Sequence, residues 1–289
     1  PRRWTVCQPH AASARRRMQE IQRMTPKQRH TRQIRKYREL IRTTEQVVQN
    51  AREVLKMPSK VHAIDALSDI AIQDLRAQIE HHCGLGLQVI DQARRRVLEE
   101  ESVPNEQKIY SIFEPHTDLI IRGKVQKPVE FGHKVFLAES AQGLITQYRV
   151  LNGNPTDEAQ VKPSLKRHTE IFGDAPELFS ADRGFFSQDS VKDCQNVGVV
   201  LACIPQRGGK KTPERELYEK SPAFKKGQRF RAGIEGRISV LFRGRGMKRC
   251  LAEGRERFEL LVGAAVLANN LMNIAGLLIK RQQRHRPAA

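Results

Sequence analysis

Apolar residues in the first hundred positions recur at helical spacing. Between residues 28 and 55 they fall on one stripe, formed by Ile34, Tyr37, Leu40, Ile41, Val47, Val48, Ala51 and Leu55. Such a stripe predicts an amphipathic helix with a polar opposite face, which is strongly basic here. Four helices are predicted in all, over residues 14–21, 28–55, 64–79 and 87–101. Gly84 or Gly86 is expected to cap the third helix, because glycine commonly ends helices.

The pattern changes near residue 105, where β-branched and aromatic residues become frequent. Residues 131–138 and 144–151 are β-rich and are separated by a short polar turn, which predicts a β-hairpin. Helix, strand, helix and strand are then predicted in that order, over residues 158–172, 177–181, 187–195 and 199–204. This alternation implies parallel strands and an α/β layer.

The last third of the chain is predicted to be loop and helix. Residues 206–226 are rich in glycine and lysine and are expected to form a flexible loop, followed by helices over residues 230–241 and 258–279. The proposed domains are therefore a basic helical region (1–104), an α/β domain (105–279) and a basic tail (280–289).

The net charge of the chain indicates what kind of partner it binds. The chain has 289 residues and a formal net charge of +19, which points to a polyanion, most simply nucleic acid. Residues 129–151 and 177–205 are rich in Val, Ile, Leu and Phe, which excludes a fully disordered chain. No apolar run is judged to reach the roughly 18 residues of a membrane-spanning helix, so no membrane partner is expected. The five cysteines are scattered without a CxxC pair, which indicates reduced thiols in a cytosolic protein and argues against a zinc ribbon.

Asp182 is the sharpest candidate for chemistry. It follows the short predicted strand 177–181 and precedes Gly184. Ligands of open α/β sheets bind beyond the carboxyl ends of strands, where a carboxylate can hold a hard cation such as Mg²⁺. The alternative is that Asp182 only forms a turn or caps a helix.

Glu235 is the second candidate. It is the only acid between Glu219 and Glu253, in a segment rich in lysine and arginine. Its alternative role is an ordinary ion pair with Arg231, four residues earlier on the same helix. Two carboxylates are also typical of glycosidases, but a neutral sugar gains nothing from such a basic segment.

Several motifs together resemble the C-terminal part of bacterial insertion-sequence DDE transposases. They are S-A-D-R-G-F around Asp182, R-x-x-I-E-G-R-I-S-V-L around Glu235, E-P-H-T-D-L-I-x-R-G-K at residues 114–124, and F-G-H-K-V-F-L-A at residues 131–138. The resemblance covers most of residues 105–275, and the preceding helical region is similar to an insert found in the same group.

The resemblance implies an RNase H-like mixed sheet flanked by helices, in which two aspartates and a glutamate hold two Mg²⁺ ions, with Mn²⁺ as a substitute. Asp182 matches the second aspartate and Glu235 the glutamate. The implied activity is cleavage and strand transfer at element ends, with the terminal repeats and target DNA as partners and an oligomer in the DNA complex. The implied location is the bacterial cytoplasm, on the nucleoid. Candidate DNA contacts are Arg183, Arg231, Arg237 and Arg243.

Three departures qualify the resemblance. Phe242, followed by Arg243, replaces a lysine common in the family, and Gln228 replaces a common tyrosine. The first aspartate is not found, because the earlier aspartates Asp65, Asp69, Asp74 and Asp91 lie in helical patterns and Asp118 fits poorly. The chain is therefore expected to lack the family's first strand, which agrees with its beginning at Pro1, and to have little or no strand-transfer activity alone. The alternative function is an inactive DNA-binding remnant.

Three weaker motifs are given structural roles. The segment 208–212 lacks the spacing of a phosphate-binding loop and is expected to be a mobile basic loop. His81, His82 and Cys83 are adjacent and cannot all face one ion from a helix, so they are assigned to a helix end. Asn269 and Asn270 are expected to cap a buried contact within the last helix.

Overall fold

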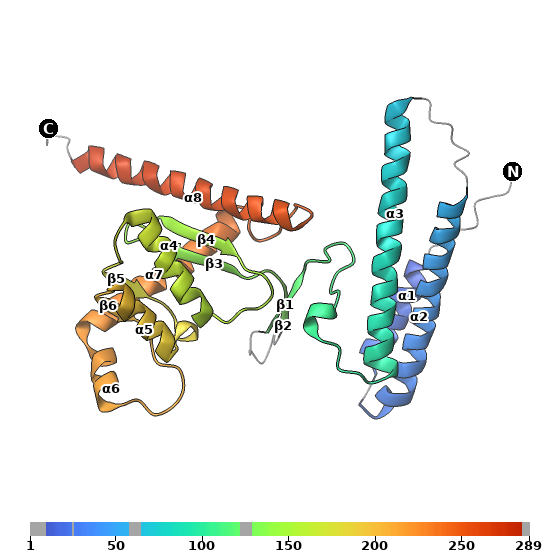
Figure 1. Cartoon of the computed structure of the whole chain (residues 1–289), viewed down its shortest axis with the longest axis horizontal. Helices are drawn as coiled ribbons and strands as arrows, with labels where there is room; N and C mark the ends of the chain where they lie inside the picture. Colours follow the sequence, from blue (N-terminus) through green and yellow to red (C-terminus); the bar gives the residue numbers. More distant parts are fainter. Residues whose placement is uncertain (1–9, 25, 58–64, 122–128, 285–289) are drawn as a thin grey trace. The chain divides into compact units, whose positions relative to one another are not determined.

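The computed structural model describes residues 10–24, 26–57, 65–121 and 129–284, with only the backbone of residues 26–31. The chain divides into two compact units, unit 1 (Pro1–Thr117) and unit 2 (Asp118–Ala289). Unit 1 is helical and unit 2 is mixed α/β (Figure 1). The predicted class, an α/β protein preceded by a helical region, is therefore confirmed at this level.

Unit 1 is built on two long antiparallel helices. Helix α1 (Ala11–Gln22) packs on α2 (Pro26–Lys56), and α2 packs along α3 (Ala66–Ala93), which continues into a π-helical turn (Arg94–Leu98). The carboxylate of Asp65 accepts a hydrogen bond from the Ser68 N–H and caps α3. The apolar stripe predicted for residues 28–55 does face the neighbouring helix, with a core of Ile41, Val48, Cys83 and Ile90.

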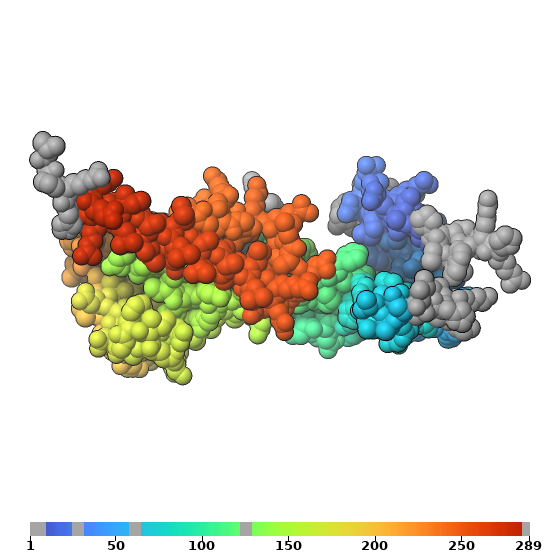
Figure 2. All heavy atoms as spheres, turned by 90° about the horizontal axis from the view of Figure 1, so that it is seen from above, coloured from blue at the N-terminus to red at the C-terminus, as the bar shows by residue number. Residues whose placement is uncertain are grey.

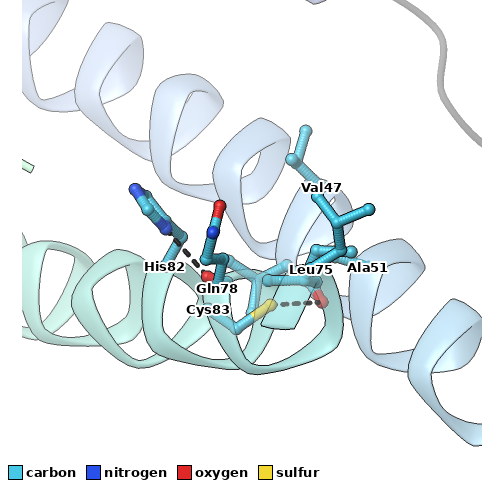
Figure 3. A pocket seen from close by; sticks show the side chains of 8 residues that line it. Val47, Ala51, Leu75, Gln78, His82 and Cys83 are labelled. Carbon is cyan, nitrogen blue, oxygen red and sulfur yellow. Dashed lines mark hydrogen bonds between the residues drawn. The ribbon is translucent and has the colours of Figure 1, made fainter. Parts of the chain in front are cut away.

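Helix α3 does not end at Gly84, so the prediction of two separate helices at residues 64–79 and 87–101 is wrong. A Cβ atom on Gly86 would lie 3.0 Å from Cγ2 of Val48, which shows that this glycine permits close approach of α2 and α3. His82 and Cys83 consequently lie within the helix (Figure 3). The thiol of Cys83 points to the Val48 carbonyl, whereas Nδ1 of His82 lies on the exposed side, 2.8 Å from the Gln78 carbonyl.

Unit 2 begins with two antiparallel strand pairs. Strand β1 (Asp118–Ile121) pairs with β2 (Val129–Gly132), and β3 (Val135–Glu139) pairs with β4 (Ile145–Val150). The predicted hairpin is confirmed, but its first strand is split into β2 and β3. Gly132 has a φ of +140°, and the next side chain, His133, turns inward to Asp118 and is only 4% exposed. The side chain of Lys134 bonds to the Pro155 carbonyl.

The predicted α/β alternation follows and is confirmed. A short 3-10 turn (Glu158–Gln160) leads into α4 (Val161–Phe172), followed by β5 (Leu178–Ser180), α5 (Gln188–Val197) and β6 (Leu201–Cys203). Strands β5 and β6 are parallel. The glycines at positions 173 and 198 take the left-handed conformation that ends α4 and α5. The core of this layer is formed by Val161, Leu165, Ala181, Cys194, Val199 and Ile204.

Most of the segment 206–226 is helical, so the prediction of one flexible loop is wrong there. It contains α6 (Pro213–Lys220) and the first turn of α7 (Pro222–Gly244). Thr212 and Ser221 cap these helices, and each precedes a proline at the first helical position. Because the hydroxyl of Thr212 accepts from the Arg215 N–H, this residue belongs to a helix start. The sequence signal that the prediction missed was a threonine or serine cap followed directly by proline.

Helix α8 (Arg255–Arg284) ends the described chain and packs on β4 and α7. Asn270 bonds twice to the backbone of Ile145, at 2.9 and 2.8 Å, and Asn273 donates to the Gly143 carbonyl. The predicted polar contact is therefore confirmed for Asn270, whereas Asn269 is buried and its Nδ2 has no hydrogen-bond partner among the described residues. The statement that no apolar run reaches spanning length is wrong for α8. An 18-residue window there has a mean hydropathy of 1.7, so length and composition alone would allow it to cross a membrane, as they would for many core helices.

The described strands form three two-stranded sheets. The single RNase H-like sheet that the resemblance implies therefore remains a prediction.

Candidate functional site

Asp182 lies immediately beyond the carboxyl end of β5. The preceding residue, Ala181, is buried in the core of the α/β layer, and this anchors the backbone that carries Asp182. Asp182 itself is exposed and extended, and its Oδ1 accepts a 2.6 Å hydrogen bond from the Gly184 N–H. Asp182 therefore caps the 3-10 turn Arg183–Phe185, as its alternative role required, while its side chain remains open to solvent.

A second carboxylate, Asp157, lies beside Asp182 and was missed from the sequence. A Cβ atom on Gly184 would lie 2.7 Å from Oδ2 of Asp157 and 3.0 Å from Oδ1 of Asp182. The two oxygens are therefore at most about 6 Å apart, a span that a divalent cation with its ligands can bridge. Asp157 sits 25 positions earlier, in the turn that leads into α4, and only the chain fold brings it here.

Lys134 fixes the orientation of Asp157. Its ammonium lies 3.2 Å from Oδ1 of Asp157, so this oxygen is engaged while Oδ2 faces Gly184. The Asp157 side chain is 42% exposed, which leaves it accessible to a ligand from solvent. Asp182 from the loop after β5, Asp157 from the turn before α4 and the ammonium group of Lys134 thus lie together.

Helix α7 is held against the ends of β5 and β6 by two residues. Gly227 lies so close to β6 that a Cβ atom there would be 2.9 Å from Cβ of Cys203. The amide of Gln228 donates to the Ala181 carbonyl at 3.1 Å and also to the Cys203 carbonyl. Gln228, which departs from the family's tyrosine, therefore ties α7 to the residue just before Asp182.

Glu235 lies two helical turns beyond Gln228, which corresponds to about 10 Å along α7. Its side chain is 69% exposed, and Oε1 accepts a 3.1 Å bond from Arg231. This is the ordinary ion pair that the spacing allowed. No hydrogen bond or ion pair in the described chain links Glu235 to Asp182 or Asp157.

The four candidate arginines differ in their surroundings. Arg183, next to Asp182, and Arg243, in the last turn of α7, are exposed. Arg231 is tied to Glu235, and Arg237 bonds to Glu139 at 3.0 Å. Because Glu139 is largely buried and lies on β3, the Arg237 pair anchors α7 to the hairpin. Arg183 and Arg243 are therefore the two most accessible to DNA phosphate.

Asp118, the weakly supported candidate for a first aspartate, belongs to a different cluster. Its Oδ2 lies 2.7 Å from Nδ1 of the buried His133. Arg255 approaches the same ring nitrogen at 3.2 Å and donates to the Val150 carbonyl at 2.8 Å. The Asp118 side chain thus takes part in joining β1, the turn before β3 and the start of α8.

Several groups in the layer beneath Asp182 have shifted pKa values. Burial raises the pKa of the Cys194 and Cys203 thiols to about 11, so both are neutral near pH 7. At Glu219 burial opposes ionisation, but Lys211, the Gln206 N–H and Arg215 outweigh it and lower its pKa. Glu219 therefore fixes the basic segment around residues 206–212 to α6, where a mobile loop was expected.

The donor set can be compared with the Mg²⁺ that the resemblance implies. Mg²⁺ is commonly held by one or two carboxylates together with water and substrate phosphate. Asp182 and Asp157 fit that requirement, because both offer accessible oxygens toward the same point. Glu235 is engaged by Arg231 and is not brought to them. Within the described ranges no group of three or more histidine, cysteine or acidic side chains is placed to hold a metal.

The fold and this site define a mixed α/β protein with two carboxylates beyond the end of a parallel strand pair and a strongly basic chain around them. Comparison with protein-family models, curated proteins and solved structures finds no match to this chain.

Proposed function

We propose that this chain is a DDE-type DNA transposase, or the C-terminal portion of one, that uses Asp182 in metal-dependent phosphodiester chemistry. The observation that carries the proposal is the pair of carboxylates, Asp182 and Asp157, facing one point beyond β5. The order of the motifs around Asp182 and Glu235 and the net charge of +19 support it. The proposed setting is the bacterial cytoplasm, with double-stranded DNA as the partner.

The proposed roles follow from where each side chain lies. Asp182 and Asp157 would hold Mg²⁺, which when bound stabilises charge on the attacking and leaving oxygens of a phosphodiester. Lys134 orients Asp157, and Gln228 fixes the backbone before Asp182. Glu235 is assigned as the third acid only by its match to the family motif. It would have to leave Arg231 to join the other two.

DNA binding is assigned first to the exposed arginines. Arg183 adjoins Asp182 and Arg243 ends α7, so both can reach phosphate without breaking an ion pair. Contacts of this kind set affinity and salt dependence, whereas sequence choice requires contacts to base edges. Arg231 and Arg237 are assigned to phosphate only in the DNA complex, since both are paired in the free chain.

The competing function is a DNA-binding remnant without metal chemistry. It is favoured by the ion pair of Glu235 with Arg231, which leaves that acid outside the carboxylate pair. Both functions require DNA binding, but only the transposase requires a metal at Asp182. Metal binding therefore separates them.

The deciding experiment measures Mn²⁺ binding by electron paramagnetic resonance on the whole chain and on Asp182→Asn. Asparagine keeps an oxygen that can accept from the Gly184 N–H, so the turn is retained while the charge is lost. We expect the Mn²⁺ dissociation constant to rise at least about tenfold. Asp189→Asn is the matched control, because Asp189 is a 90% exposed acid nearby in sequence, at the start of α5. It should bind Mn²⁺ as the unmodified chain does.

Three outcomes contradict the proposal. If the unmodified chain binds no Mn²⁺, or if Asp182→Asn binds Mn²⁺ as tightly as the unmodified chain, while DNA binding persists, the remnant function is correct. If the chain binds no DNA at low salt, both functions are wrong. If Mg²⁺-dependent DNA cleavage is detected and survives in both Asp182→Asn and Glu235→Gln, the catalytic assignment is wrong.

A further inference from the structure

A cavity of about 350 Å³ lies between β4 and α4 in unit 2, away from the carboxylate pair. It is lined by Gln147 and Arg149 from β4 and by Lys166, Arg167 and Glu170 from α4, among others. The side chains of Lys166 and Arg167 are 79% and 59% exposed. In Figure 2 the surface around α4, coloured yellow-green, lies open beside the red α8. The cavity is therefore open to a small molecule from solvent.

Arg149 in the cavity wall has hydrogen-bond donors without acceptors. Its Nε and Nη2 are enclosed and have no partner among the described residues. Together these two nitrogens carry three N–H donors. The face of the guanidinium lies over the ring of Phe136, 4.8 Å from the ring centre. Stacking of this kind leaves the N–H groups at the edge unsatisfied, so Arg149 lacks acceptors that a ligand can supply.

The charge of Arg149 is not neutralised by an acid. Burial lowers the pKa of its guanidinium, and no neighbouring carboxylate raises that pKa. Glu170 is the one acid among the described residues that line the cavity, and it lies 3.1 Å from Arg167 and 4.0 Å from Lys166. Three basic side chains thus share one carboxylate, which is engaged by the two on α4. The lining has an excess of positive charge and favours an anion.

Gln147 adds an acceptor to the same wall. The residue is only 7% exposed, and its Nε2 donates to the Ser164 carbonyl at 3.0 Å, whereas its Oε1 is enclosed and has no partner among the described residues. Gln147 and Arg149 are two positions apart on β4, so their side chains leave the same face of the strand about 7 Å apart. A ligand that matches both must accept from Arg149 and donate to Gln147.

A phosphate group with unesterified oxygens has both properties. Its oxygens accept strongly from a guanidinium, and near neutral pH it can keep a proton on one oxygen, which makes an O–H donor. Sulfate carries no proton at that pH, and the phosphodiester of DNA has none either. Neither of these anions can therefore donate to Oε1 of Gln147.

We propose that the cavity between β4 and α4 binds a phosphate group with unesterified oxygens, from inorganic phosphate or from a phosphorylated small molecule. A rotation of the Arg149 side chain turns its N–H groups toward the phosphate oxygens, and Oε1 of Gln147 accepts from the phosphate O–H. Lys166 and Arg167 attract the anion at the rim. The inference does not rest on the proposed function, because none of these residues belongs to the carboxylate pair or to the candidate DNA contacts.

Isothermal titration calorimetry of the whole chain with inorganic phosphate, at neutral pH and fixed ionic strength, tests the site. Arg149→Leu keeps an apolar contact with Phe136 but has no donors, so the dissociation constant should rise at least about tenfold. Arg149→Lys keeps the charge without the planar set of donors and should raise it about three- to tenfold. Arg257→Leu is the matched control, because Arg257 is an exposed arginine on α8, and it should bind phosphate as the unmodified chain does.

Sulfate and a phosphate ester test the chemistry of the ligand. Sulfate should bind at least about tenfold more weakly than phosphate, because it leaves Oε1 of Gln147 without a donor. Gln147→Met should reduce this preference, an effect that a purely structural role of Gln147 would not produce. Glycerol 3-phosphate distinguishes the two sources: tighter binding than inorganic phosphate indicates a phosphorylated small molecule, and weaker binding indicates free phosphate.

Other results overturn the site. A chain that binds no phosphate at millimolar concentrations contradicts it, as do unchanged phosphate affinities in Arg149→Leu and Arg149→Lys. Sulfate that binds as tightly as phosphate contradicts the role of Gln147. If phosphate does not bind but Arg149→Leu weakens DNA binding with its helix content unchanged, the cavity is a contact for the DNA backbone and the proposal is wrong. Should Arg149→Leu fail to fold, Arg149→Lys supplies the result.

Discussion

The α/β layer of unit 2 and the helix pair of unit 1 enclose their cores to different degrees. Four of the six core residues of the layer (Val161, Leu165, Cys194 and Ile204) are at most 1% exposed, with Ala181 and Val199 at 8% and 9%, whereas no core residue between α2 and α3 is less than 5% exposed. A layer of helices on strands surrounds a side chain, but two helices alone leave one side open. The open side is a groove of about 310 Å³ lined by Val47, Leu75, Gln78 and His82, among others (Figure 3).

The largest expected effect is the loss of stability when a core side chain is truncated, and it can be measured in both cores. Leu165→Ala should lower the free energy of unfolding of unit 2 by about 2–5 kcal/mol, because the enclosed site cannot collapse around the cavity. Ile41→Ala in unit 1 should lie at the low end of that range, because its core adjoins an open groove. Hydrogen exchange followed separately in the two units measures both losses. Equal losses in the two units would show that the degree of enclosure does not determine the cost of truncating a core side chain.

A second comparison uses the two glycines at helix contacts. A Cβ atom added at Gly227 would lie 2.9 Å from the Cβ of Cys203 and still closer to its sulfur. Cys203 belongs to strand β6, which cannot move away. Gly227→Ala should therefore cost about 1–3 kcal/mol of stability in unit 2 by overpacking. At Gly86 the nearest atom is a single methyl group of Val48 at 3.0 Å. Alanine favours the helix by up to about 1 kcal/mol at both positions, so the difference comes from the contact, and Gly86→Ala should destabilise less because one methyl group can rotate away.

Chemical denaturation of the two glycine variants measures this difference. If Gly86→Ala were as destabilising as Gly227→Ala, the backbone of α2 and α3 would be as rigidly placed as the strand. Thermal unfolding of the same variants gives a second measurement of which substitution is more destabilising. The comparison thus separates contacts that a side chain can relieve from contacts that it cannot.

These glycines also show where the sequence predicted the fold and where it did not. Gly173 and Gly198 end helices as local patterns suggest, and the parallel pair β5 and β6 follows from the alternation around them. Gly86 has the same local appearance as a helix end, yet it serves a contact with Val48, 38 positions earlier. A distant partner of this kind leaves no local signal.

The residues of the candidate site likewise include some that the sequence identified and one that it did not. Asp182 was identified because a strand and a glycine turn flank it in sequence, and the structure places it beyond β5. Asp157 was missed because its proximity to Asp182 depends on the path of α4 and on the anchor from Lys134. For Glu235 the sequence offered two roles, and the free chain has the ion pair with Arg231.

A smaller effect is expected from pH, and it is confined to unit 2. Burial raises the pKa of Cys194 and Cys203 from 9.0 to about 11. The unfolded thiols therefore lose protons first, so the stabilisation is complete below pH 9 and is lost as the pH rises through 11. Each thiol should contribute a loss of about 1 kcal/mol by pH 10. Urea unfolding at several pH values measures it.

The matched variants for this pH effect are Cys203→Ala and Cys250→Ser. The first removes one buried thiol and should reduce the slope of stability with pH between pH 9 and 11. The second alters an exposed cysteine and should leave the slope unchanged. A slope that is identical in both variants would assign the pH dependence to other groups, such as Tyr218, whose pKa burial also raises.

The smallest expected effect concerns Glu235, and it bears most directly on function. Because the Glu235 side chain is 69% exposed, Glu235→Gln should change the free energy of unfolding by less than about 0.5 kcal/mol. A residue that contributes so little to stability can be exchanged without disturbing the fold, so any loss of Mn²⁺ binding in Glu235→Gln would report a direct role. Equal Mn²⁺ affinity before and after the substitution would restrict the site in the free chain to Asp182 and Asp157. A destabilisation well above 1 kcal/mol would instead show that the pair with Arg231 holds α7 in place.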